Sequence, residues 1–230
     1  MKIGVVKTLS IYPVKSLAGV EVNSIKLSQR GCEWDRLYAI YNAQRKIASG
    51  KNTRRFFRLD GILDLEAVIE NDQVFIKEAK NNIKLLATSA DANEYVSALT
   101  DCKVTIQKES DILHMDDGQV HLITTADLEA LSKKHGSLVS DKRFRANIVL
   151  ESSKTSVELL QYKQIEIGDA LLTPIKQSER CRMVNLQQGE ALLDNKVLKS
   201  VAEKNGVNFG IYLKPDNFES MIVGSDVSVL

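Results

Sequence analysis

Cys181 has the surroundings that best suit chemistry in this sequence. It stands between Arg180 and Arg182 in the segment KQSERCR, residues 176–182, directly after a strand-like run. Neighbouring cations lower the pKa of a thiol, and the thiolate is the form that attacks electrophiles and binds soft metals. The segment therefore predicts a reactive or metal-binding thiolate, although an isolated cysteine can equally be a small buried apolar residue.

Several polar residues elsewhere share the chemistry of anion binding. A planar guanidinium can donate two parallel hydrogen bonds to a phosphate, and a helix start offers free backbone N–H groups to the same ligand. The candidates are Lys15 and Ser16 after a strand, Arg36 opening another strand, Thr124 and Thr125 at a helix start, and Arg145 and Asn147 before an apolar strand. If Arg145 and Asn147 lie on that strand, its two-residue period puts both on one face. Each candidate taken singly could equally be a solvated or structural residue.

Other classes of site find little support. The sequence has neither a Gly-x-x-x-x-Gly-Lys phosphate loop nor a Gly-x-Gly-x-x-Gly motif after a strand. Its three histidines are scattered and it has no Cys-x-x-Cys pair, so we do not expect a zinc centre. The net charge of +1 argues against nucleic acid as a partner, even though residues 51–58 are basic; their arginines can instead screen the same anionic pocket.

The elements that must position these residues are mostly strands. Strands are predicted over 3–11, 20–27, 36–41, 63–70, 73–77, 82–86, 103–107, 146–151, 164–167, 170–175, 208–214, 220–223 and 227–230. Helices are predicted over 91–99 with Asp91 as N-cap, over 124–134 with a threonine cap, and over 190–203 with one apolar face. Many short strands with few helices indicate a mostly β protein of the α+β class, closed or sandwiched.

Composition and cysteine usage narrow the cellular setting. The chain has 230 residues, 43% apolar and 27% charged, which is typical of a globular protein with one large core or two small ones. We expect neither a secretion signal nor a membrane partner, because the N-terminal apolar run is short and no 18-residue apolar run exists. Three widely spaced cysteines fit a reducing compartment, so the expected location is cytoplasmic.

Four segments, taken in order, resemble the signatures of MOSC-domain proteins. They are IYPVKS at 11–16, GCEWDR at 31–36, FRANIV at 144–149 and the segment around Cys181. The resemblance extends over essentially the whole chain, and the ordered set is more specific than any one piece. Within the family, the sequence is similar to the amidoxime-reducing branch, which includes the mitochondrial amidoxime-reducing component.

The resemblance implies a fold and a cofactor. The fold is a MOSC-type β-barrel core over 111–230, preceded by a smaller β-rich N-terminal part over 1–110, closely packed around one site. The cofactor is a molybdenum cofactor (Mo-molybdopterin), with Cys181 as the protein ligand to the metal. The implied cofactor contacts are Lys15, Ser16, Arg36, Thr124 or Thr125, Arg145, Asn147, Glu179, Arg180 and Tyr212. Pyridoxal phosphate binding is a further possibility at the level of the family.

The resemblance also implies an activity, the reduction of N-oxygenated compounds such as hydroxylamines and amidoximes. Many bacterial relatives carry a ferredoxin-type module; because this chain ends at Leu230 without its four cysteines, we expect electrons from a separate flavin or iron–sulfur protein. Two alternatives stay open. Cys181 could carry sulfur as a persulfide, as is proposed for MOSC domains fused to cofactor sulfurases, or the chain could bind and transfer the cofactor without turnover.

The sequence departs from the family pattern in two places. Ala146 stands where proline is frequent, and VNLQQG at 184–189 replaces a turn resembling Val-Asp-Pro-x-Thr-Gly. Losing the aspartate of that turn is expected to weaken cofactor ordering or to change the substrate pocket.

Overall fold

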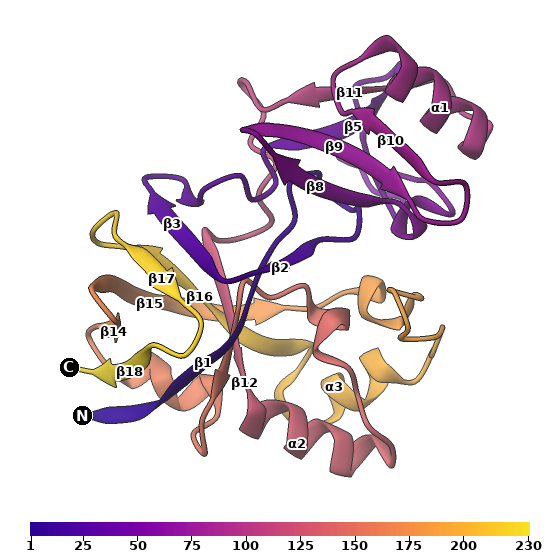
Figure 1. The fold of residues 1–230 in the computed structure, drawn as a ribbon. Helices are drawn as coiled ribbons and strands as arrows, with labels where there is room; N and C mark the ends of the chain where they lie inside the picture. The colour runs from indigo at the N-terminus through magenta and orange to yellow at the C-terminus, as the bar shows by residue number, and fades with distance from the viewer.

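Strands from both ends of the chain close a barrel. The computed structural model describes the backbone throughout and the side chains of residues 1–203 and 206–230. The strands of the largest sheet are β1 (Lys2–Ile11), β2 (Val20–Val22), β12 (Val120–Thr124), β13 (Ile148–Glu151), β14 (Ile165–Ile167), β15 (Ala170–Glu179), β16 (Asn208–Pro215) and β18 (Asp226–Val229). They pair in the order β13-β12-β16-β15-β14-β18-β1, and β1 pairs back onto β13, so the ring closes (Figure 1).

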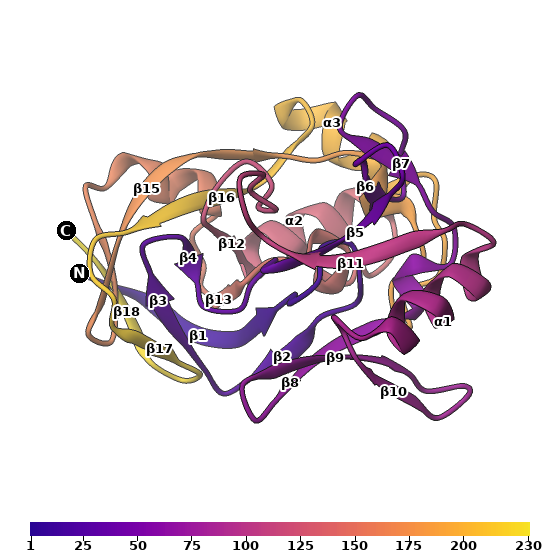
Figure 2. The same cartoon turned by 90° about the horizontal axis from the view of Figure 1, so that it is seen from above.

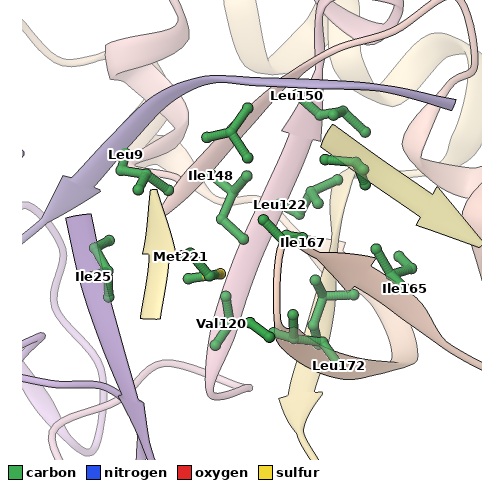
Figure 3. Packing of buried hydrophobic residues seen from close by; sticks show 14 of the residues in the cluster. Leu9, Ile25, Val120, Leu122, Ile148, Leu150, Ile165, Ile167, Leu172 and Met221 are labelled. Atoms are coloured by element: carbon green, nitrogen blue, oxygen red, sulfur yellow. The ribbon is translucent and has the colours of Figure 1, made fainter. Parts of the chain in front are cut away.

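The barrel interior is a continuous apolar core. In β13, Ile148 and Leu150 are two residues apart, and in β12 Val120 and Leu122 have the same spacing; all four are fully buried. Residues two apart on a strand point to the same face, so these pairs face inward together. Figure 3 shows their side chains meeting those of the neighbouring strands inside the ring.

The first strand joins the N-terminal part to the barrel. β1 lies between β13 and β18 and is antiparallel to both, so residues 2–11 belong in space with the C-terminal half. The chain termini lie side by side in consequence (Figures 1 and 2), and the Met1 amine donates to the carbonyl oxygen of Val229 at 2.9 Å. The spatial division of the molecule therefore differs from a division at one point of the sequence.

Three smaller sheets complete the molecule, and two of them lie wholly within the N-terminal part. Their strands are β3 (Ser24–Ser28), β4 (Gly31–Cys32), β5 (Tyr38–Asn42), β6 (Ile47–Ser49), β7 (Phe56–Arg58), β8 (Glu66–Glu70), β9 (Gln73–Glu78), β10 (Ile83–Leu86), β11 (Val104–Lys108) and β17 (Ser220–Ile222). They form the sheets β10-β9-β8, β11-β5-β6-β7 and β17-β3-β4. Helix α1 (Ala90–Thr100) packs on this part, which has a second apolar core of its own around Ile40, Leu65 and Ile76 (Figure 1). The expected mostly β architecture, with a smaller β-rich part before the barrel, is confirmed.

Two further helices lie against the barrel on the side away from α1 (Figure 1). They are α2 (Thr125–His135) and α3 (Val197–Asn205). The start of α2 is fixed by a capping box, in which Asp127 N donates to Thr124 Oγ1 at 3.1 Å and Thr124 N donates to Asp127 Oδ2 at 3.0 Å. The predicted threonine cap is therefore confirmed.

Some element boundaries differ from the sequence prediction. The helix predicted over 190–203 begins only at Val197, because Asn185 binds the preceding segment: its carbonyl accepts from Asp194 N (2.8 Å) and its Oδ1 from Leu198 N (2.8 Å). Helix α1 is capped by Ser89, not by Asp91, since Ser89 Oγ accepts from Ala92 N at 3.1 Å. None of the helices in the described part of the chain is long and apolar enough to cross a membrane.

Candidate functional site

A cavity of about 320 Å³ gathers most of the predicted site residues between the barrel and the N-terminal part. The predicted residues that line it are Lys15, Ser16, Arg36, Arg145, Asn147, Glu179, Arg180, Cys181 and Tyr212. They come from the loop after β1, the turn before β5, the segment before β13, the end of β15, and β16. Residues up to about 200 positions apart in sequence thus share one wall.

Cys181 enters this wall from the end of β15. The strand stops at Glu179, and Cys181 precedes a short 3-10 helix, Arg182–Asn185, whose Val184 N donates to the Cys181 carbonyl at 3.2 Å. The thiol is free and half-buried. Of its two arginine neighbours, Arg180 lines the cavity, whereas Arg182 is exposed outside it.

Three non-glycine residues of the wall have left-handed backbone: Ser16 at φ 71°, Arg36 at φ 50° and Arg145 at φ 52°. This region is unfavourable for L-residues and is enriched at functional sites. Arg145 terminates a 3-10 helix, and β13 begins only at Ile148, so the expectation that Arg145 and Asn147 lie on a strand is wrong. They share the cavity because the turn carries Arg145 there, and not through strand periodicity.

Arg36 and Lys15 are buried cations joined through carboxylates. Arg36 Nη1 pairs with Asp35, Arg36 Nη2 donates to the Arg145 carbonyl at 3.1 Å, and Arg36 Nε lies 3.6 Å from Asp116 Oδ2. Lys15 Nζ lies 2.6 Å from Asp116 Oδ1. Burial raises the pKa of Asp116, but the charges of Lys15 and Arg36 outweigh it, so the pKa lies well below its usual value and the carboxyl is ionised.

Arg145 is the buried cation that the protein leaves most available. The residue is 9% exposed, and its guanidinium lies 4.2 Å from the ring centroid of Tyr12 without a hydrogen-bond partner among the described residues. Burial, and next to it the charge of Arg36, lowers the pKa of Arg145 to about 10. A charge removed from water in this way gains most from an incoming anion.

Two more donors face the same ligand space. Ser16 is a residue with 6% of its surface exposed, and its hydroxyl has no partner among the side chains and backbone described. Arg180 donates to Ser178 Oγ and to the Phe144 carbonyl, both at 2.8 Å, while its Nε is buried without a partner. Buried donors are normally satisfied, so these are candidates for ligand contacts.

Asn147 is occupied by the protein itself. Its Oδ1 accepts from His121 N at 3.1 Å, and its Nδ2 donates to the Ser10 carbonyl at 3.2 Å. The amide therefore joins β1 to β12 at the base of the cavity. Its role in the geometry is to position His121, whose pKa burial lowers well below the ordinary value, with the charge of Arg180 acting in the same direction.

Thr124 and Thr125 do not line this cavity, in contrast to the expectation from the sequence. Thr124 is fully buried in the capping box, and Thr125 Oγ1 donates to the Ser152 carbonyl at 3.1 Å. Within the first turn of α2, the Asp127 N–H is bound by Thr124 Oγ1, and the Asp127 carboxylate turns back to Thr124 N. The helix start is used for folding, and the structure does not bring it to the site.

The sequence analysis did not identify several further residues of the wall. They are Ser49, Phe56, Asp116, Asp117, Gly118, His121, Phe144 and Met183. Lys51 and Arg55, from the basic segment 51–58, also line it, with cationic groups 5.2 Å from the ring centroid of Phe56. Among the described lining residues, six Lys or Arg side chains face three carboxylates, so the cavity is net positive. The sequence analysis expected arginines of this segment at the pocket; Arg55 lines it, whereas Arg54 and Arg58 do not.

Comparison with known proteins identifies the family. The MOSC N-terminal beta barrel domain matches residues 3–113, and the MOSC domain matches residues 109–228. The chain is 24% identical over 97% of its length to a molybdenum cofactor sulfurase from Oryza sativa subsp. japonica, and 25% identical over 92% to molybdenum cofactor sulfurase 3 from Aedes aegypti. It spans about a third of each, 34% in both cases.

A solved structure supports the fold. The YUAD protein from Bacillus subtilis superposes with a TM-score of 0.54 at 10% identity, covering 98% of this chain and 94% of that one. At this identity the likeness concerns the fold alone. Since the two domain matches together cover almost the whole sequence, the chain belongs to the MOSC family, with the MOSC N-terminal beta barrel domain preceding the MOSC domain.

Proposed function

We propose that the cavity binds a molybdenum cofactor and that Cys181 is the protein ligand to its metal. One observation carries this proposal: a free cysteine lines the same cavity as buried cations with unpartnered donors. A thiolate suits a soft metal, and the cations suit a phosphate. Distant similarity to molybdenum cofactor sulfurases supports association with the same cofactor.

The residues present fit such a group. A molybdopterin has a phosphate at one end and a dithiolene-bound metal at the other, so it needs an anion site and a thiolate in one cavity. Arg145, Arg180 Nε and the Ser16 hydroxyl supply unsatisfied donors for the anionic end. The cavity volume of about 320 Å³ is within the range of small-molecule sites.

The chain's own part in the chemistry is placement and charge compensation. When bound, the cofactor supplies the two-electron redox step at the metal. Cys181, at the end of β15, would hold the metal, and the buried cations would hold the phosphate. Asn147 fixes the β1–β12 junction from which this wall is built.

The reaction that we propose is the reduction of hydroxylamines and amidoximes. The N–O bond of the substrate breaks, two electrons and two protons are consumed, and the products are the reduced nitrogen compound and water. The electrons are proposed to come from a separate flavin or iron–sulfur protein. A small N-oxygenated substrate would enter from the half-exposed side of Cys181.

Metal and pterin content of protein made in a cofactor-proficient host tests the binding. Wild type is expected to hold molybdenum and pterin near stoichiometry, while Cys181→Ala loses the molybdenum. Cys102→Ala is the matched control, because this cysteine is also half-buried and free but lies outside the cavity. Wild-type protein that holds neither metal nor pterin contradicts the proposal. If wild type does hold both, turnover of benzamidoxime with a chemical reductant tests the activity.

A sulfur-carrier role is a second candidate, favoured by the sulfurases among the relatives. In that role Cys181 holds a persulfide: its thiolate takes the outer sulfur of a partner protein's persulfide, and the partner's thiol is the leaving group. Cyanide treatment measures it: cyanolysable sulfur present in wild type and Cys102→Ala but absent from Cys181→Ala supports it. Wild type with molybdenum but without cyanolysable sulfur favours the reductase, and cofactor with no turnover under any donor favours a binding and transfer module.

A further inference from the structure

The segment between β11 and β12, residues 109–119, places a carboxylate on the cavity's buried cations. Asp116 Oδ1 lies 2.6 Å from Lys15 Nζ, and Asp116 Oδ2 lies 3.6 Å from Arg36 Nε. Lys15 Nζ also donates to the His114 carbonyl at 2.7 Å. Both cations are buried, whereas the Asp116 side chain is 51% exposed. The Asp116 carboxylate therefore contacts the two buried cations from the solvent-exposed side of the cavity.

The ends of this segment are anchored independently of the cavity. At one end, both carboxylate oxygens of Glu109 accept from Arg30 Nη2 at 3.0 Å. At the other, Gln119 Nε2 donates to the Gln29 carbonyl at 2.6 Å. Between these anchors the backbone is irregular, and Arg55 of the cavity wall donates to the carbonyls of Leu113 and Met115. The cavity's cations thus hold the middle of the segment, together with Tyr41 Oη and Glu109 Oε2 on His114 and Lys176 on Asp117.

We propose that Asp116 is a specificity-determining residue that occupies, with its own carboxylate, the place of an anionic ligand group beside Lys15 and Arg36. The inference rests on the proposed function, in which these cations hold the phosphate end of the ligand. Binding then exchanges one anion for another and releases residues 113–118 from the cations. No covalent bond forms or breaks in this exchange.

The exchange favours phosphate over a simple carboxylate. A phosphate group carries almost two charges and three acceptor oxygens. It can contact the two cations that Asp116 now binds and, in addition, the free Arg145 guanidinium and the Ser16 hydroxyl, with which Asp116 forms no hydrogen bond among the described contacts. A monocarboxylate offers no more than Asp116 already does. The residue therefore excludes weak anions and admits a strong one.

Titration calorimetry with inorganic phosphate on cofactor-free, full-length protein tests the proposal. Asp116→Asn removes the competing charge from two close cations, and we expect it to bind phosphate about tenfold more tightly than wild type. Wild type should not bind acetate measurably, whereas this variant should. The matched control is Asp60→Asn, which removes a carboxylate from an exposed ion pair with Arg58 outside the cavity. It should change the phosphate affinity by less than about twofold.

Equal or weaker phosphate binding by Asp116→Asn overturns the proposal, as does the absence of binding by both proteins. If Asp116→Asn does not fold, amide hydrogen exchange on wild type decides: phosphate should speed exchange over 113–118, and unchanged or slower exchange refutes the release. The result is separable from that of the proposed function. If Asp116→Asn binds phosphate more tightly but the protein never acquires molybdenum, the proposed exchange is supported and the proposed cofactor is refuted. If the protein acquires molybdenum but Asp116→Asn does not bind phosphate more tightly, only the exchange is refuted.

Discussion

The barrel core and the cavity wall differ in both backbone and side chains. The core consists of regular strands whose apolar side chains alternate inward, and it contains residues such as Leu122 and Leu150 that have no exposed surface. The wall combines strand ends with loop residues, and it includes buried charges on left-handed backbone, such as Arg36 and Arg145. The core maximises stability, whereas the wall keeps charges desolvated and donors unsatisfied, which is unfavourable for folding and favourable for ligand binding.

The largest expected effect on stability lies in the core. Leu150→Ala should lower the free energy of unfolding by about 2–5 kcal/mol, because it leaves a void in a closely packed interior. Urea unfolding followed by circular dichroism measures this. Leu138→Ala, at a residue 92% exposed, is the matched control and should change stability by less than about 0.5 kcal/mol. Similar losses in both variants would contradict the described core.

Acidification should act at a buried histidine next to the cavity wall, His114, whose carbonyl accepts from Lys15 Nζ. Burial lowers the pKa of His114 from 6.5 to about 4, so the folded state holds the ring neutral while the unfolded state takes up a proton. The contribution of His114 to the free energy of unfolding is therefore fully present above pH 6.5. It is lost as the pH drops toward 4, by up to about 3 kcal/mol. Urea unfolding at pH 7, 6 and 5 measures the slope of the unfolding free energy against pH. His114→Gln should reduce this slope, and an unchanged slope would refute the assignment of the pH dependence to His114.

Removing a cation from the wall should separate binding from stability. Arg145→Gly removes an unpaired buried charge and relieves a left-handed backbone, so its unfolding free energy should stay within about 1 kcal/mol of wild type. Its affinity for inorganic phosphate should fall at least about tenfold, since a buried charged donor is lost. Arg45→Gly is the matched control, because Arg45 also has a left-handed backbone, at φ 56°, and is exposed outside the cavity. Equal loss of affinity in both would contradict a specific role for Arg145.

The smallest effect is expected at the rim. Lys176 pairs with Asp117, and both side chains are largely exposed, 46% and 68%. Exposed ion pairs contribute little, so Lys176→Gln should cost less than about 1 kcal/mol in urea unfolding. A larger loss of unfolding free energy would contradict this, because it would show that the exposed ion pair stabilises the fold as much as buried core residues do.

The sequence predicted the core better than the wall, for physical reasons. Alternating or continuous apolar runs such as 148–150 are local signals, and they located most of the barrel strands. The short buried strand β12 was not predicted, because its sequence VHLIT mixes a histidine and a threonine into an otherwise apolar run. Ring closure through β1 and β13 depends on residues more than 130 positions apart, which no local pattern shows.

Within the wall, residue types were predictable and conformations were not. Cys181, Arg36 and Arg145 were found from their chemistry and from the MOSC resemblance, yet the left-handed turns at Arg36 and Arg145 contradict the strand geometry that their neighbours suggest. Thr124 was expected at the site because helix starts bind anions, but its hydroxyl is buried and accepts from Asp127 N in the capping box. Asp116 escaped prediction because its partner Lys15 is 101 residues away.

X-ray absorption at the molybdenum edge tests the central claim, that Cys181 and the cationic wall hold one cofactor between them. Purified wild type and Cys181→Ser, each loaded with the cofactor, would be compared. The account predicts one fewer sulfur neighbour of molybdenum in Cys181→Ser than in wild type, with pterin still retained by the cations. Identical sulfur coordination in the two proteins would show that Cys181 is not the ligand and would contradict the account.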